Sequence, residues 1–173
     1  MTENHGNEHL GTYLRDHLSG ASFGVELAQR IAESNRGTSF GEPLSRIAAE
    51  IEADREELVS LMEALDVNRD VIKESLAWAG EKVARLKLNN RLAGYSPLSR
   101  MEEIEALMLG VSGKLALWRV LIQVREQYLP LATADLPQLA ERAEVQRVLL
   151  EDMRMKAGAA AFDAAAPAEA LVS

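Results

Sequence analysis

The chain has 173 residues, a formal net charge of −8 and no cysteine. Its length is typical of one domain with a core large enough to need no covalent cross-links. Without cysteine it has no disulfide, no thiolate metal ligand and no thiol nucleophile. The excess of acids, with the bases scattered among them, argues against nucleic acid and anionic membrane surfaces as partners.

The pattern along the chain predicts three parts. Residues 1–8 are a flexible polar leader, residues 9–158 a helical domain, and residues 159–173 a disordered alanine-rich tail with little to bury. The leader lacks the apolar segment of a secretory signal, so we expect a cytoplasmic protein.

Apolar residues at spacings of three and four predict a first helix from about His9 to Asn35. Gly37 is suited to the left-handed residue that follows a helix. The second helix is expected to begin near Glu42–Pro43, with Ser39 as a capping residue. Asp54 interrupts its apolar stripe, which consists of Leu44, Ile47, Ile51, Leu58, Leu61 and Leu65.

A third helix is predicted from about Arg69 to Leu92, with a mildly basic centre at Lys82, Arg85 and Lys87. It could belong to the bundle or connect other helices across it. A break at residues 93–97 separates it from the next helix.

The most apolar stretch of the chain is Ala106–Val124, within a central helix expected from about Pro97 to Leu129, with Ser99 and Glu102 at the spacing of a capping box. Its apolar run is shorter than the ~20 residues that a membrane span needs. Lys114 and Arg119 would each cost roughly 2.5–3.5 kcal/mol at a bilayer centre. The sequence therefore favours a central bundle helix over a membrane span.

Two glycines, Gly110 and Gly113, interrupt this central helix. Each is about 1 kcal/mol less favourable than alanine in a helix interior. We expect another backbone to approach closely there, and a local helix irregularity is the alternative. A polar line seven residues apart is expected to face solvent and consists of Glu105, Ser112, Arg119 and Glu126.

After a break at residues 130–134, Asp135 can cap a last helix, with Gln138 three positions later. Gln146 stands within the stripe of this helix, which otherwise consists of Leu136, Leu139, Ala143, Leu150, Met153 and Ala157. Five helices with short loops and no strand signal predict an all-α protein, an antiparallel four-helix bundle with an additional helix.

Asp54 and Gln146 are polar residues at apolar positions, and His17 borders the first stripe. A buried carboxylate needs a partner, because an unpaired buried charge is costly. The candidate partners of Asp54 are His17, Arg15, Lys114 and Arg119. The group forms either a structural polar layer or a ligand or metal pocket between the helices.

Bundles hold two-metal sites with a Glu from each of two helices and a Glu-x-x-His motif from each of two others. The motif is absent here, because Ala53 and Glu144 stand where histidines are needed. We expect no metal. An unorthodox iron or manganese site would use His17, Glu50 and Asp54, since hard cations take oxygen ligands.

Lys114, Trp118 and Arg119 share the central helix. An arginine beside a tryptophan could bind an anion or an aromatic group at the mouth of a small-ligand pocket. The alternative, which we favour, is a cationic edge facing acids such as Glu50 or Glu52. No catalytic nucleophile motif is present, and Gly110–Lys114 lacks the glycine spacing and preceding strand of a phosphate-binding loop.

Four segments of the chain carry a resemblance to other proteins, and they are Tyr13–Gly20, Glu50–Asp54, Gly80–Leu88 and Gly113–Arg119. In these segments the chain resembles a group of small bacterial helical proteins of uncharacterised activity, which is itself similar to ferritin-like bundles. The resemblance covers about residues 10–157 and implies a ferritin-like bundle without an activity or metal ligands that can be carried over.

These observations favour a non-catalytic bundle protein that acts by binding a protein partner or by forming a homo-oligomer. The alternatives are a ferritin-like metalloprotein with the carboxylate and histidine site above, and a binder of a small ligand between helices.

Overall fold

The computed structural model describes residues 3–68 and 95–163, and within them the chain is helical with no strand. This confirms the all-α class. The third predicted helix, at 69–92, lies outside the described residues, as does most of the predicted tail. The described helices are α1 (Glu3–Ser34), α2 (Gly41–Ala64), α4 (Pro97–Val124), the 3-10 turn η1 (Arg125–Gln127), α5 (Leu129–Thr133) and α6 (Leu136–Ala161).

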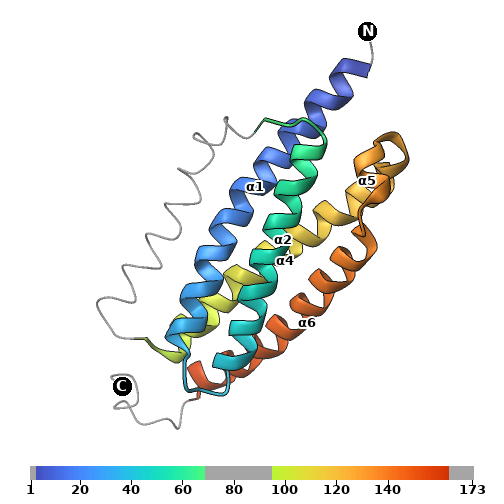
Figure 1. Cartoon of the computed structure of the whole chain (residues 1–173). Coiled ribbons are helices and arrows are strands. Elements are labelled where there is room, and N and C mark those ends of the chain that lie inside the picture. Colours follow the sequence, from blue (N-terminus) through green and yellow to red (C-terminus); the bar gives the residue numbers. More distant parts are fainter. Residues whose placement is uncertain (1–2, 69–94, 164–173) are drawn as a thin grey trace.

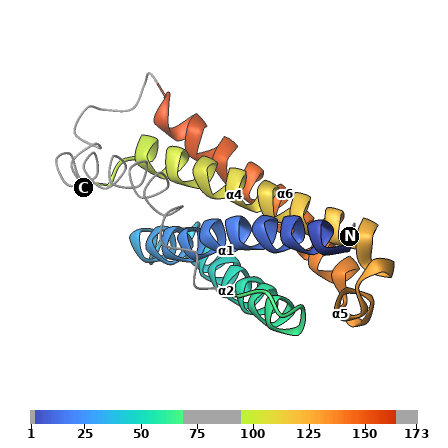
Figure 2. The same cartoon turned by 90° about the horizontal axis from the view of Figure 1, so that it is seen from above.

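The four long helices form two antiparallel hairpins, α1 with α2 and α4 with α6 (Figure 1). The hairpins meet mainly where α1 packs beside α4, as the view from above shows (Figure 2). α2 and α4 run in the same direction, whereas α1 and α6 run in the opposite one (Figure 1). The short helix α5 lies at the end of the bundle where α6 begins.

Glycines form the tight turn between α1 and α2. Gly37 has φ of 80°, as expected for the left-handed position after a helix. A Cβ on Gly41 would lie 2.6 Å from the carbonyl oxygen of Asn35, so only glycine fits where the chain reverses. Asp66, the other residue at positive φ in the described part of the chain, follows α2 at its far end.

Two of the three predicted helix caps are wrong. Phe40, not Ser39, precedes α2, and its side chain makes no capping hydrogen bond. The Ser96 hydroxyl, not that of Ser99, accepts a hydrogen bond from the Ser99 amide at 3.1 Å at the start of α4. The third prediction is confirmed, because Asp135 accepts from the Gln138 amide at 3.1 Å.

Several predicted boundaries also differ from the structure. α1 begins at Glu3, so residues 3–8 form its first turns and are not a separate leader. The central helix ends at Val124 instead of Leu129, and the expected break at 130–134 contains α5. Pro130 fits there because a first helical turn needs no amide hydrogen at that position. α6 continues past Gly158 to Ala161.

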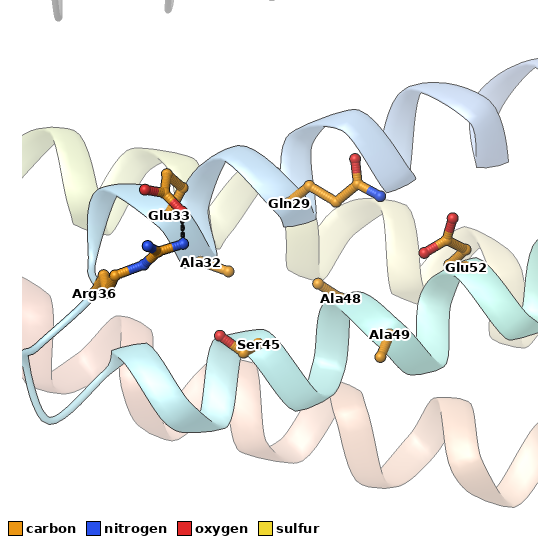
Figure 3. A pocket seen from close by; sticks show the side chains of 8 residues that line it. All are labelled: Gln29, Ala32, Glu33, Arg36, Ser45, Ala48, Ala49 and Glu52. Atoms are coloured by element: carbon orange, nitrogen blue, oxygen red, sulfur yellow. Dashed lines mark hydrogen bonds and ion pairs between the residues drawn. The ribbon is translucent and has the colours of Figure 1, made fainter.

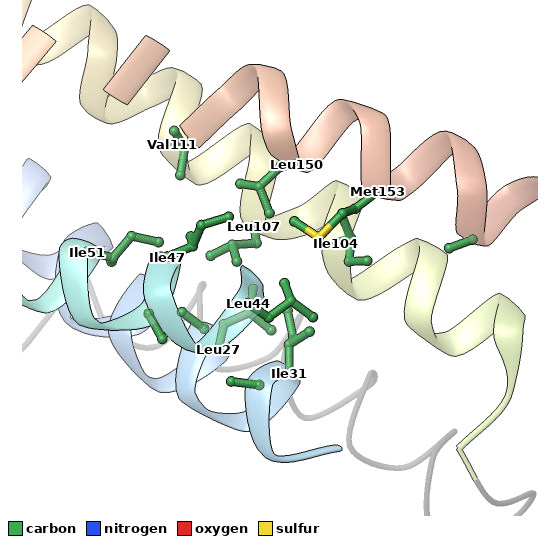
Figure 4. Packing of buried hydrophobic residues seen from close by; sticks show 14 residues of the cluster. Leu27, Ile31, Leu44, Ile47, Ile51, Ile104, Leu107, Val111, Leu150 and Met153 are labelled. Atoms are coloured by element: carbon green, nitrogen blue, oxygen red, sulfur yellow. The ribbon is translucent and has the colours of Figure 1, made fainter. Parts of the chain in front are cut away.

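The core consists of two apolar clusters, one toward each end of the bundle. The first joins all four long helices near the α1–α2 turn (Figure 4) and includes Leu27, Ile31, Leu44, Ile47, Ile104, Leu107 and Leu150. The second lies toward α5 and includes Leu14, Leu18, Leu58, Met62, Trp118, Leu121 and Leu131. The predicted stripe of α6 is confirmed, because all seven of its positions are buried.

The prediction for Gly110 and Gly113 is wrong. A Cβ at either position would meet no atom of the described residues within 4 Å, and α4 is an unbroken helix through both. The close approach occurs instead at Gly158 on α6, where a Cβ would lie 3.2 Å from the Met101 sulfur. The two glycines of α4 therefore lie on its open side.

By length and composition, Pro97–Gln127 is the one segment of the described chain that could cross a membrane, with a window hydropathy of 1.4. Lys114 and Arg119, which the sequence counts against a span, both lie within this segment. A core helix of a bundle meets the same criterion. Only 33% of the window is buried here, so much of this apolar helix faces outward.

Candidate functional site

A polar layer separates the two apolar clusters. Asp54 lies between Ile51 and Leu58 on α2, Lys114 between Val111 and Leu115 on α4, and Gln146 between Ala143 and Leu150 on α6. Along its own helix, each of these three polar residues has a core residue of one cluster before it and a core residue of the other cluster after it. The layer therefore crosses the middle of the bundle on three helices.

Asp54 is the centre of this layer and is 1% exposed. Lys114 donates to its Oδ2, and Arg142 of α6 donates to its Oδ1 through both Nε, at 2.7 Å, and Nη2. Of the four partners that the sequence suggested, the structure confirms Lys114. Arg142 was missed, although a base four residues before Gln146 on the same helix could have indicated it.

Two amide hydrogen bonds extend the layer. Lys114 Nζ donates to Gln146 Oε1 at 2.6 Å, and Gln146 Nε2 donates to Glu50 Oε2 at 2.8 Å. Gln146 is fully buried, and both ends of its amide are used. One chain of contacts thus runs from Glu50 through Gln146 and Lys114 to Asp54, and it ties α2 to α4 and α6.

The electrostatics favour a structural role for this layer. Burial lowers the pKa of Lys114, and the Asp54 carboxylate opposes that shift. Removing one partner of such a buried pair leaves an uncompensated charge, which typically costs about 3–5 kcal/mol. The Asp54 oxygens are occupied by cationic side chains, so a metal ion or ligand would first have to displace them.

The structure places His17 away from the contacts of Asp54. Its ring packs edge-on against Tyr13 of the same helix, with centroids 4.5 Å apart. Burial lowers the pKa of His17, with a smaller opposing effect from Asp16. Asp54 takes its partners from α4 and α6 instead. Across the described residues, no group of three or more histidines and carboxylates is arranged to hold a metal.

Trp118 and Arg119 face opposite environments. Trp118 is 1% exposed within the second apolar cluster, and its Nε1 has no hydrogen-bond partner among the described residues. Arg119 is largely exposed and lies 3.7 Å from Glu144 of α6. The structure therefore does not bring the two together at the mouth of a pocket, and Arg119 pairs with an acid other than the expected Glu50 or Glu52.

A second polar group joins the end of α1 to the start of α4. The buried Asn35 donates to Tyr95 Oη at 2.7 Å and accepts from Arg100, whose guanidinium stacks on the Phe40 ring. Burial, with the charge of Glu103, raises the pKa of Tyr95 to about 12. The sequence indicated Asn35 only as a helix stop.

The buried carboxylate of Glu103 was also missed by the sequence. It accepts from Arg30 of α1 at 3.1 Å, which adds a further link between the two hairpins. By sequence alone, a buried acid at the edge of an apolar stripe looks the same as an exposed acid.

An open groove of about 270 Å³ lies between α1 and α2 (Figure 3). Its floor consists of small side chains, and the Glu33–Arg36 ion pair stands at one end. None of the predicted site residues lines it. The lining residues are Gln29, Ala32, Glu33, Arg36, Ser45, Ala48, Ala49 and Glu52.

The chain matches no family model, no curated protein and no solved structure.

Proposed function

We propose that the protein is a non-catalytic helical bundle of the ferritin-like type, which acts by binding another protein surface or a second copy of itself. The arrangement of α1, α2, α4 and α6 supports the ferritin-like part. Two antiparallel hairpins are joined by the long segment 69–94, and α2 and α4 run parallel. Ferritin-like folds have one such long connection.

One observation carries the binding role. Every large apolar side chain that is exposed in the described chain lies after residue 97, on α4, α5 and α6 or directly beyond α6. Exposed apolar residues that are gathered in one patch are typical of an interaction site. The polar layer supports a non-catalytic role, because Lys114 and Arg142 neutralise the carboxylate at the bundle centre.

Elemental analysis and native mass spectrometry of the protein, purified without a metal-binding tag, test this proposal. We expect neither a stoichiometric metal nor a retained small molecule, in the wild type or in Asp54→Ala. About one iron or manganese per chain that is lost in Asp54→Ala would overturn the proposal in favour of the site at His17, Glu50 and Asp54. A retained small molecule that is lost in Trp118→Phe would overturn it in favour of the ligand binder.

A further inference from the structure

Most of the exposed apolar residues of α4 and α6 fall on two lines, one along each helix, and Val145 and Leu149 of α6 lie outside them. Leu98, Leu109 and Val120 follow each other at spacings of eleven, which is close to three full helical turns. Val148, Met155 and Phe162 follow at spacings of seven along α6 and its end. Because residues at these spacings share one side of a helix, each helix presents one apolar line. We call these two lines and the seam between them the α4/α6 face.

Ion pairs fill the seam between the two lines. Arg119 reaches Glu144, which also binds Arg147, and Arg154 binds Glu151 and lies 3.3 Å from Glu105. Both cross-helix pairs join α4 to α6, so they fix the two helices beside each other. Three acids and three bases are neutralised within the face itself.

The charge of the chain is divided unequally between the hairpins. α1 and α2 together carry twelve Asp and Glu residues and four Lys and Arg residues, a balance of −8. α4 and α6 carry seven of each, a balance of zero. Two copies that met through α4 and α6 would have their acidic hairpins on the outside, where like-charge repulsion is smallest. Two copies that met through α1 and α2 would oppose −8 to −8.

The size of the α4/α6 face is sufficient for a stable dimer. Helices of 28 and 26 residues are about 40 Å long, and two side by side are about 20 Å wide. This surface is on the order of the ~800 Å² per partner that a standard interface buries.

From these observations we infer that the α4/α6 face is the contact surface for a second copy of this chain, related to the first by a two-fold axis. A two-fold axis lets one neutral, apolar face serve both partners. The inference rests on the proposed binding function and names its partner and its surface. Leu109, Val148 and Met155 are the central contacts.

Sedimentation velocity of the full chain, from about 1 to about 100 µM, tests the inference. The wild type should sediment as a dimer of twice 19.0 kDa. Leu109→Glu and Val148→Glu should each weaken dimerisation at least about tenfold, because each places an unpaired carboxylate in the contact. Ala53→Glu, at an exposed position of α2, is the matched control and should dimerise like the wild type. Circular dichroism checks that all four proteins are folded.

A wild type that stays monomeric at the highest concentration would overturn the inference, and so would a dimer that neither face variant weakens. If a monomeric wild type co-sediments with phosphatidylcholine and phosphatidylglycerol vesicles and Leu109→Glu does not, the face binds a lipid surface and not a second copy. If a monomeric wild type binds no vesicles, the α4/α6 face is the contact surface for a different protein. None of these results depends on bound metal, so the elemental analysis decides the proposed function separately.

Discussion

The two hairpins are similar in length, but their surfaces differ in charge and in exposed apolar residues. α1 and α2 keep every large apolar side chain at least partly buried, carry the whole negative balance and leave an open groove floored by small residues. α4 and α6 are neutral, and their outer face is apolar. This difference is what we expect if the second hairpin makes the proposed contact and the first stays in water. Among the described residues, the polar links between the two include Asp54, the Arg30–Glu103 pair and the Asn35–Arg100 hydrogen bond.

The largest expected change in the free energy of unfolding comes from the buried side of α4, compared with its outer side. Trp118→Ala should lower the free energy of unfolding by about 4 kcal/mol, because it empties a large volume in the second apolar cluster. Val120→Ala, two residues away but 45% exposed in the single chain, should change the free energy of unfolding of the monomer by less than about 0.5 kcal/mol. Urea unfolding followed by circular dichroism measures both. A mild effect at Trp118 would contradict its burial.

The link between the hairpins is tested at Asp54. Asp54→Ala should lower the free energy of unfolding by about 3 kcal/mol, because Lys114 stays in the layer without its counter-charge. The triple variant Asp54→Leu, Lys114→Met and Arg142→Met should recover most of that loss, since neither cationic partner of Asp54 is then left without its counter-charge. Chemical denaturation at neutral pH gives both values. A triple variant as unstable as Asp54→Ala would mean that the charges themselves stabilise the bundle.

A smaller effect of opposite sign is expected on the open side of α4. Gly110→Ala should raise the free energy of unfolding by about 0.8 kcal/mol, because alanine is the better helix residue and its Cβ meets nothing within 4 Å. Gly158→Ala on α6 is the matched control. Its Cβ would lie 3.2 Å from the Met101 sulfur, so the gain should be reduced or lost. Thermal and urea unfolding compare the two, and destabilisation by Gly110→Ala would show that a backbone does pack there.

The smallest expected effect is the contribution of His17, in the first hairpin, to the pH dependence of stability. Burial lowers the pKa of His17 below the usual 6.5, so the unfolded chain binds the proton more readily than the folded one. The stabilising contribution of neutral His17 is therefore complete above pH 6.5 and is lost as the pH falls through the lower folded pKa. His17→Gln should flatten this part of the stability profile. Urea titrations at a series of pH values test the slope, and an unchanged slope would assign the pH dependence to other groups.

Much of the fold could be predicted from the sequence. The apolar periods located α1, α2, α4 and α6, and the polar positions Asp54 and Gln146 in those periods are indeed buried. The sequence was a poorer guide to the helix ends. Ser39 and Ser99 both have a residue type that is favoured as an N-terminal cap, and neither of them caps its helix. A cap depends on the direction in which the chain enters the helix, and the residues next to the helix end do not determine that direction by themselves.

The candidate site was predicted only in part. Lys114 was among the proposed partners of Asp54, whereas Arg142 and the buried Glu103 were missed. Hydrophobic periodicity shows which side of a helix is buried, but not which helix lies opposite. A long side chain at the edge of a stripe can reach inward or outward, and its neighbour decides between the two.

The sequence by itself determined the helices, their buried sides and the unequal charge of the two halves, because these follow from residue type and a fixed helical period. Only the tertiary structure decided that Asp54 meets Lys114 and Arg142, that Gly110 and Gly113 face open space, and that two apolar lines adjoin on α4 and α6. Such features depend on distances between helices far apart in the chain. Those distances are set by the packing of all the helices together, and no single stretch of residues contains them.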